Sequence, residues 1–389
     1  MLFEKNRENF YPLSSSHFLG ELICGFFSLA DGLSRLYDQR KIFLIAPDYL
    51  KPYIKSEFPL WSTDSLPDQG LFLSTTIFPC MDVKKNIPLT GGEEMFISQD
   101  ELIAVRTDTN KAKKIIANLN SWKDFNIPVK QVNLTEFKSL WDIIEFNEQA
   151  ITRHFSYSGL RGEIAPSVEL LNKKQIFIGA NSLIEDFVLI DARKGPVYVS
   201  EGVEIKSHCL IQGPAYLGPG TFIKPFSHIG EGCSFGPVCK MGGEVSHSIV
   251  LGYSNKQHYG FLGNSYLGNW VNLGAGTCTS NLKNNYSAVK ILLPHRKLDS
   301  GLQFLGLMAG DHVKSAIGTL FNTGTVAGFG ANILHTGLTP KYIKPFQWGE
   351  DQKYEIEKFL KTAEIILYRR DKKLTPEYKK LIKYIYDQN

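Results

Sequence analysis

Large apolar side chains recur at every sixth position through the middle of this 389-residue chain. Neither the 3.6-residue period of an α-helix nor the two-residue period of a strand produces this spacing. The repeat predicts a solenoid of short strands and sharp corners, in which each coil buries its apolar residues against the next coil. The longest run is Val199, Ile205, Ile211, Leu217, Ile223, Ile229, Phe235 and Met241, and shorter runs are Ile178, Ile184 and Ile190, then Phe261, Leu267 and Leu273.

A β-sandwich of short strands is the alternative architecture, but it would not hold one spacing over eight repeats. Glycine follows many of the periodic positions, as a sharp corner requires. Two stretches break the repeat, residues 243–260 and 281–301. We expect both to leave the solenoid as loops, and such loops are where function concentrates.

The segments on either side of the repeat differ from it in pattern. Residues 1–150 are typical of an α/β domain, with a helix expected over 18–37, strands over 41–46 and 71–78, and a connector over 141–151. Residues 340–348 are expected to be an extended link. Two amphipathic helices should follow within residues 341–389, the second with Thr375 as N-cap and Pro376 in its first turn, ending near Asp387. These helices would cap the open end of the solenoid.

Composition narrows the class of protein. The net charge is +4, and residues 341–389 carry all of it, with 12 Lys and Arg against 8 Asp and Glu. So small a charge does not indicate a nucleic-acid partner, and a solvated helix face explains the tail. The most apolar stretch, residues 22–30, is far shorter than the ~20 residues of a membrane span. No signal peptide is visible, and the six cysteines form no CxxC pair. We therefore expect a cytoplasmic protein with reduced, mostly buried thiols and no membrane partner.

One stretch of the repeat carries a recognisable motif. It runs from Lys256 through His258 and Phe261 to Asn264, continues with Asn272-Leu273-Gly274-Ala275-Gly276-Thr277, and ends at Asn281. This motif resembles the acetyltransferase half of the bifunctional GlmU family. The resemblance implies a left-handed parallel β-helix over residues 165–340, acetyl-CoA as cofactor, a small-molecule sugar as substrate and a homotrimer.

His258 is the candidate general base. Acetyl transfer to an amine requires the neutral amine, and an imidazole with an ordinary pKa near ~6.5 can take the proton at neutral pH. The thioester is already activated, so no serine or cysteine nucleophile is required. By resemblance, Asn281 positions the amine and the base, Asn272 contacts the sugar, and Gly274, Ala275 and Gly276 lie beside the thioester. The remaining candidate substrate contacts are Lys240, Lys256, Phe261, Lys283 and Lys290, and no metal site is expected here.

The motif departs from the family pattern at the sugar-binding positions. Phe261 replaces a tyrosine. Where the family holds a sugar phosphate with two arginines and two lysines, this chain has Lys240, Gly242, Ser246, His247 and Ser248. The acceptor therefore stays open between an amino-sugar phosphate and a nucleotide sugar. A longer set of matches, which includes residues 141–142 and 346–349, resembles a divergent GlmU-like branch described as sugar nucleotidyltransferases.

Three other functions remain as alternatives. The N-terminal domain could transfer a nucleotide with Mg²⁺, using Asp82 or Asp108, with the β-helix as a trimerisation scaffold. Against it, residues 11–17 lack the glycines and the arginine of the usual triphosphate loop. The chain could also be a catalytically inactive GlmU-like protein. A zinc hydratase is disfavoured, because His247 and His258 are 11 residues apart and His208 and His228 are 20 apart, too far for a close ligand pair.

Overall fold

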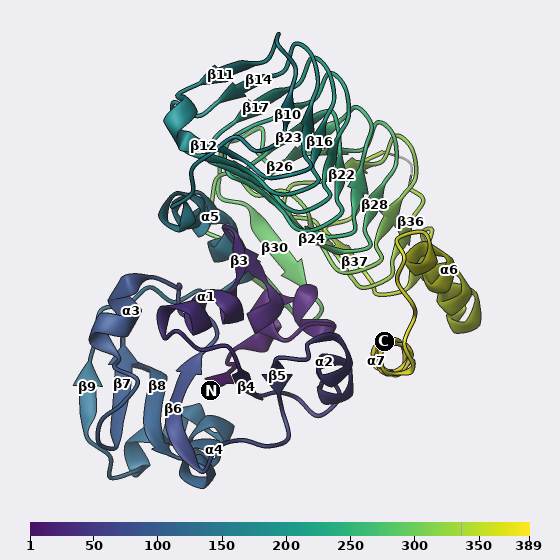
Figure 1. Cartoon of the computed structure of the whole chain (residues 1–389). Helices are drawn as coiled ribbons and strands as arrows, with labels where there is room; N and C mark the ends of the chain where they lie inside the picture. The colour runs from purple at the N-terminus through teal and green to yellow at the C-terminus, as the bar shows by residue number, and fades with distance from the viewer. Residues whose placement is uncertain (336) are drawn as a thin grey trace.

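The structure, a computed structural model, describes residues 1–335 and 337–389 and has a parallel β-helix at its centre (Figure 1). Three sheets form its faces. The eleven-stranded face starts at β10 (Glu163–Ile164), the six-stranded face at β11 (Glu169–Leu171) and the nine-stranded face at β12 (Ile176–Ile178). In the first coils each turn adds one strand to each face in parallel register. The solenoid predicted from the repeat is confirmed.

The six-residue spacing corresponds to one strand and one corner. All eight periodic side chains from Val199 to Met241 are fully buried inside the β-helix. Three repeats complete one coil, because Glu204 in β16 (Glu204–Ile205) pairs with Phe222 in β19 (Phe222–Ile223), 18 residues later. Corners contain residues with positive φ, and several of these are not glycine, among them His208 and Phe226.

The prediction that residues 243–260 leave the solenoid is wrong. These residues form β23 (Glu244–Ser246), β24 (Ile249–Gly252) and β25 (Asn255–Lys256), one on each face. Lys240 in β22 (Lys240–Met241) pairs with Asn255, only 15 residues later. This coil is three residues shorter than the one before it, so the spacing of the sequence breaks while the β-helix continues.

Residues 281–301 do leave the β-helix, as predicted. They contain a hairpin of β30 (Lys290–Leu293) and β31 (Arg296–Asp299), which reaches from the solenoid toward the N-terminal domain (Figure 1). Its apolar residues Val289, Ile291 and Leu293 share a buried cluster with Phe10 and Leu13 of that domain. The hairpin therefore attaches the N-terminal domain to the β-helix.

The N-terminal domain is built on a seven-stranded mixed sheet with the order β5-β4-β1-β6-β8-β7-β9. The predicted strands at 41–46 and 71–78 correspond to β4 and β6, although β6 ends at Ser74. The strands of this sheet are β1 (Leu2–Phe3), β4 (Ile42–Ile45), β5 (Trp61–Ser62), β6 (Gln69–Ser74), β7 (Glu94–Ser98), β8 (Glu101–Asp108) and β9 (Val129–Gln131). The helices are α1 (Leu29–Leu36), α2 (Lys51–Glu57), α3 (Met81–Asn86), α4 (Thr109–Ala117) and the connector α5 (Leu140–His154).

A single helix over residues 18–37 was expected, and this prediction is wrong. A hairpin of β2 (Ile23–Cys24) and β3 (Phe27–Ser28) occupies the middle of the range, with Gly25 at φ +71° in its turn. Only α1 is helical, and it begins where the side chain of Ser28 accepts a hydrogen bond from the backbone N–H of Asp31. Within this apolar run, the positive φ of Gly25 makes a hairpin turn, and the N-cap at Ser28 starts the helix.

The C-terminal tail consists of α6 (Ile356–Tyr368) and α7 (Pro376–Asp387), with Thr375 as the N-cap of α7, as predicted. Phe359 of α6 packs on Phe346 in the last coil, with ring centroids 5.0 Å apart, so the tail caps that end. Tyr384 of α7 stacks on Tyr49 of the N-terminal domain at 4.5 Å. The expected extended link over 340–348 is wrong, since it contains β37 (Tyr342–Ile343) and β38 (Gln347–Trp348), which belong to the β-helix.

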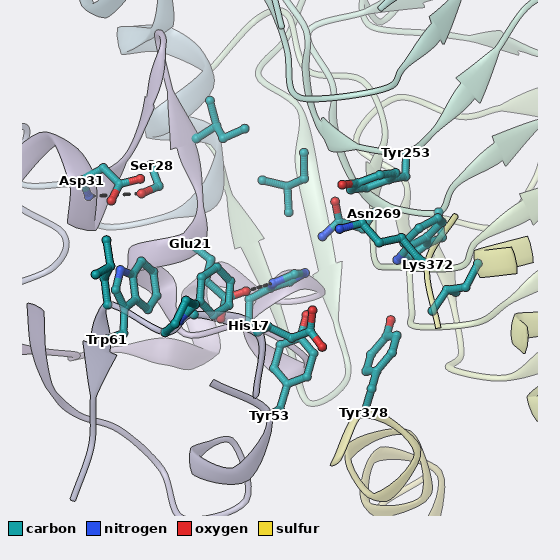
Figure 2. A pocket seen from close by; sticks show the side chains of 18 of the residues that line it. His17, Glu21, Ser28, Asp31, Tyr53, Trp61, Tyr253, Asn269, Lys372 and Tyr378 are labelled. Atoms are coloured by element: carbon teal, nitrogen blue, oxygen red, sulfur yellow. Dashed lines mark hydrogen bonds and ion pairs between the residues drawn. The ribbon is translucent and has the colours of Figure 1, made fainter. Parts of the chain in front are cut away.

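A buried ionic network holds the N-terminal domain on the nine-stranded face. The imidazole of His17 lies 2.6 Å from a carboxylate oxygen of Glu21 and 2.9 Å from one of Asp311, and the first contact is drawn in Figure 2. Burial opposes the charged imidazole, but the charges of Asp311 and Glu21 outweigh it and raise the pKa of His17 to about 10. His17 and Asp311 are 1% and 2% exposed.

Two smaller expectations concern the whole chain. The six cysteines are free, four of them buried and two half-buried, as predicted. Among residues 1–335 and 337–389, no helix has the length and apolar character needed to cross a bilayer.

Candidate acyl-transfer site

His258 stands at the corner between the eleven-stranded and six-stranded faces, in the turn from β25 to β26 (Phe261–Gly263). Its side chain is exposed. Lys256 holds this turn, because its ammonium donates to the carbonyl oxygens of Gly242, His258 and Gly260 at 2.7–2.8 Å. These three hydrogen bonds therefore fix the turn that carries the candidate base.

Lys256 is not a substrate contact, and that prediction is corrected. The side chain is 2% exposed, and its three N–H donors are all used by backbone carbonyls. Burial lowers the pKa of this lysine to about 8. A lysine next to a catalytic motif is ordinarily assigned to a phosphate, and only the fold shows that this one points inward.

Phe261 and Asn281 are brought together on the six-stranded side of the same corner. A Cβ at Gly263 would overlap the Phe261 ring and would lie 2.9 Å from Nδ2 of Asn281. The Asn281 amide donates to Oδ1 of Asn264 at 2.8 Å, which fixes its orientation. The sequence prediction did not include Asn264 in the site, although it lies within the motif.

Asn264 also lines a cavity of about 350 Å³ between the β-helix and α5. Here Nε2 of His247 lies 2.9 Å from a carboxylate oxygen of Glu148. The hydrogen bond to Glu148 raises the pKa of His247, and burial raises the pKa of the neighbouring Glu145. An acidic helix thus faces the positions where the resembling family carries basic residues. Nothing in the spacing of residues 148 and 247 could have indicated this contact.

Lys240 and Asn272 lie on a different face from Phe261. They belong to β22 and β28 (Asn272–Leu273) of the eleven-stranded face, with Asn255 between them in register. Asn255 donates to Oδ1 of Asn272 at 3.2 Å and accepts from Arg370 of the tail at 3.0 Å. Burial and the charge of Arg370 lower the pKa of Lys240. Within one chain these two residues and the Phe261–Asn281 pair flank the His258 corner from opposite sides.

Gly274, Ala275 and Gly276 form the same corner one coil further on. The N–H of Gly276 donates to the carbonyl of Tyr259 at 3.0 Å, and the Ala275 carbonyl accepts from Gly318 at 2.7 Å. A Cβ at Gly318 would meet nothing within 4 Å. Residues 274–276 carry no side chain larger than a methyl group, and the ring of Tyr259 from the His258 turn lies over Gly276, where its hydroxyl oxygen would be 3.0 Å from an added Cβ.

Lys283 and Lys290 lie on the excursion that carries the hairpin. The Lys283 ammonium donates to the carbonyl of Ala288 and to Ser287 Oγ, so it closes its own loop, contrary to the predicted phosphate contact. Lys290 is exposed on β30. The carbonyl of Lys290 accepts from Lys341 at 3.1 Å.

The two aspartates proposed as metal ligands lie apart. Asp82 is on α3 and pairs with Lys85 at 3.6 Å, while Asp108 caps α4 by accepting from the N–H of Lys111. They line two different cavities. In the described part of the chain no three His, Cys, Asp or Glu side chains are grouped so that they could hold a metal ion.

Comparison with known proteins agrees with the two halves of the structure. Residues 1–159 match the family model described as sugar nucleotidyl transferase. A bifunctional sugar-1-phosphate nucleotidylyltransferase/acetyltransferase of Sulfurisphaera tokodaii is 34% identical over 156 residues, which are 39% of this chain and 37% of that protein. The bifunctional protein GlmU of Thermodesulfovibrio yellowstonii is 37% identical over 101 residues, 26% of this chain and 19% of that protein. The GlmU of an Azoarcus species is 30% identical over 133 residues, 29% and 27% of the two chains. The match thus covers less than two fifths of each of these relatives.

Proposed function

We propose that this GlmU-like protein is an acetyl-CoA-dependent N-acetyltransferase that acts on an amino-sugar phosphate or a nucleotide sugar. The observation that carries the proposal is the turn held by buried Lys256, which presents exposed His258 one coil before the small residues Gly274, Ala275 and Gly276. Acetyl-CoA and such acceptors are cytoplasmic metabolites, which places the reaction in the cytoplasm.

The chemistry needs one proton transfer and a held amine. Acetyl-CoA supplies an acetyl group already activated as a thioester. The neutral imidazole of His258 takes a proton from the attacking amine and can return it to the leaving sulfur. Asn281, oriented by Asn264, offers an amide to the acceptor on the six-stranded side of the corner. The small residues 274–276 let the cofactor approach the backbone, and the N–H of Ala275 is the donor proposed for the developing oxyanion, since those of Gly274 and Gly276 bond to Ser315 and Tyr259.

The same corner supports the homotrimer. Phe187, Phe226, Tyr259 and Ile317 occupy this corner in separate coils, and each is between 62% and 79% exposed. Large apolar side chains exposed at four coils of one corner, with His208 stacked between Phe187 and Phe226, are costly in water and favour an interface. Neighbouring copies along the row would enclose His258 and bring Lys240 and Asn272 of one copy toward Phe261 of another. Sedimentation equilibrium tests this, with Phe226→Glu expected to yield monomers.

CoA thiol release from acetyl-CoA, first with glucosamine-1-phosphate and then with nucleotide amino sugars, tests the reaction. We expect His258→Ala to lower acceptor-dependent release by about 10²–10⁴-fold. His295→Ala is the matched control, because His295 is exposed at the tip of the β30–β31 hairpin. Equal rates in wild type and His258→Ala would refute the assignment of the base. No release with any acceptor would favour a β-helix kept only as a scaffold.

A second candidate, nucleotide transfer, is favoured by the match of residues 1–159 to the sugar nucleotidyl transferase family. Nucleotide transfer would require Mg²⁺, whereas the proposed acetyl transfer would not. Pyrophosphate release from a nucleoside triphosphate and a sugar 1-phosphate tests it. Loss of release in Asp82→Asn or Asp108→Asn would support this activity, and full release in both variants would show that neither aspartate is a metal ligand.

A further inference from the structure

A second cavity, of about 490 Å³, lies where the N-terminal domain, the β-helix and the tail meet. Figure 2 shows that Trp61 and Tyr53 come from the N-terminal domain, Tyr253 and Asn269 from the β-helix, and Lys372 from the tail. None of the residues assigned to the acyl-transfer site lines it. The cavity exists only when all three parts are docked.

Two stacked aromatic pairs form opposing walls. Phe58 and Trp61 have ring centroids 4.4 Å apart and planes inclined by 15°, and Tyr253 and Trp270 are 4.5 Å apart at 18°. In Figure 2 Trp61 and Tyr253 lie on opposite sides of the opening. Aromatic rings on two sides offer surfaces on which a flat ring can stack, and stacking of a nucleobase on an aromatic side chain contributes ~1–3 kcal/mol.

The polar groups of the walls can accept and donate hydrogen bonds. Asp31 is half-buried on one wall, next to Ser28, and the amide of Asn269 is on the other. Glu21 is committed to His17 on the floor. Carboxylate and amide oxygens here suit the amino and hydroxyl donors of a nucleoside rather than an apolar ring.

Two consecutive lysines stand at the mouth, in the turn between α6 and α7. Lys372 and Lys373 are exposed, and neither ammonium lies within 4 Å of a carboxylate among the residues the structure describes. The Lys372 ammonium is 5.7 Å from the centroid of the Tyr253 ring, so it is close to the aromatic wall. Of the three carboxylates in the lining, Glu21 is paired with His17, Asp31 lies on a wall, and Glu57 is near enough to Lys372 for their charges to interact. An anionic group on a ring held between the walls would meet the two lysines.

We propose that this junction cavity binds a nucleoside phosphate, with the base between the aromatic walls and the phosphate at Lys372 and Lys373. A ligand bound there contacts all three parts of the chain at once. Because the ligand binds only when these parts are docked, its binding stabilises the docked arrangement.

The test uses the full-length protein with UDP, ADP and GDP, and with glucosamine-1-phosphate and inorganic phosphate as probes that lack a base. Titration calorimetry gives Kd, and quenching of tryptophan fluorescence reports stacking at Trp61 and Trp270. We expect at least one nucleotide to bind below about 1 mM with quenching. We expect Lys372→Gln with Lys373→Gln to weaken it about tenfold or more.

Matched variants locate the site. Lys379→Gln with Lys380→Gln removes the same charge from exposed positions on α7 and should leave Kd unchanged. His258→Ala should also leave Kd unchanged, which separates this proposal from the acyl-transfer site. Tyr253→Leu should weaken binding and reduce quenching. The proposal is overturned if no nucleotide binds, if the Lys372/Lys373 variant binds nucleotides like wild type, or if glucosamine-1-phosphate quenches the tryptophan fluorescence as strongly as the nucleotides do.

Discussion

Replacing His17 by glutamine tests how the N-terminal domain is held on the β-helix. The imidazole pairs with Glu21 at 2.6 Å and with Asp311 at 2.9 Å, and Asp311 also accepts from Ser16 and from the backbone of Asn269. His17→Gln keeps a hydrogen-bonding side chain but leaves two buried carboxylates without a positive charge. Breaking a buried ion pair from one side costs about 3–5 kcal/mol, so we expect the free energy of unfolding to fall by about that amount at neutral pH.

The contribution of His17 to stability should decrease as the pH rises. His17 has a folded pKa of about 10, above its ordinary value of 6.5. The folded state therefore binds more protons than the unfolded state between these values, and stability present below pH 6.5 is lost as the pH rises toward 10. Wild type should lose stability across this window, while His17→Gln should lack this contribution and change less.

Urea unfolding followed by tryptophan fluorescence, at several pH values from 6.5 to 10, measures both effects. His295→Gln, at the exposed hairpin tip, is the matched control and should behave like wild type. Trp270 lies beside the junction and Trp61 on the facing wall, so their signal reports undocking as well as unfolding. Equal urea midpoints for wild type and His17→Gln at pH 6.5, or a wild-type midpoint that does not fall toward pH 10, would refute the reasoning.

Three further substitutions test local parts of the argument. Lys256→Met removes the ammonium that holds three carbonyls and should lower acyl transfer together with stability, the latter by ~2–5 kcal/mol in urea unfolding, because the His258 turn loses its clamp. Gly260→Ala should destabilise by more than ~1 kcal/mol and raise the acceptor KM, because Gly260 has φ +121° and a Cβ would overlap the Thr277 carbonyl; an unchanged thermal midpoint would contradict this. Thr375→Ala removes the N-cap of α7 and should cost ~1 kcal/mol, measured as faster hydrogen exchange in α7 without loss of acyl transfer.

The periodic part of the fold could be predicted because each coil depends only on its neighbours. Every large residue of the run from Val199 to Met241 is in the core, and the caps Thr375 and Pro376 begin α7 where expected. The 15-residue coil could not be predicted. A corner that is three residues shorter breaks the six-residue spacing in the sequence, although the strands remain on their faces. The hairpin at residues 23–28 was missed for a related reason: one glycine with positive φ interrupts a helix-like apolar pattern.

The site residues that lie within one sequence motif could be predicted. The contacts between residues far apart in the sequence could not. The motif predicted His258, Phe261 and Asn281 as site residues, and the structure exposes His258 and brings Phe261 and Asn281 together. Lys256 was predicted to contact substrate, yet it is buried and donates to three backbone carbonyls, a rare placement for a lysine. The pair of His17 and Asp311 spans 294 residues, and no local pattern signals it.

The three faces of the β-helix have different neighbours, and this explains why two sites can coexist. Outward residues of the nine-stranded face, such as Leu251, Tyr266 and Met308, are buried in one cluster with the N-terminal domain. The tail reaches the eleven-stranded face through Arg370. What remains open is the six-stranded face and the corner that carries His258. The proposed acyl-transfer site, at the corner that carries His258, therefore lies away from the junction cavity, which is on the docked side. A change in how the N-terminal domain docks would alter the junction cavity directly. It could affect His258 only through a change in the β-helix.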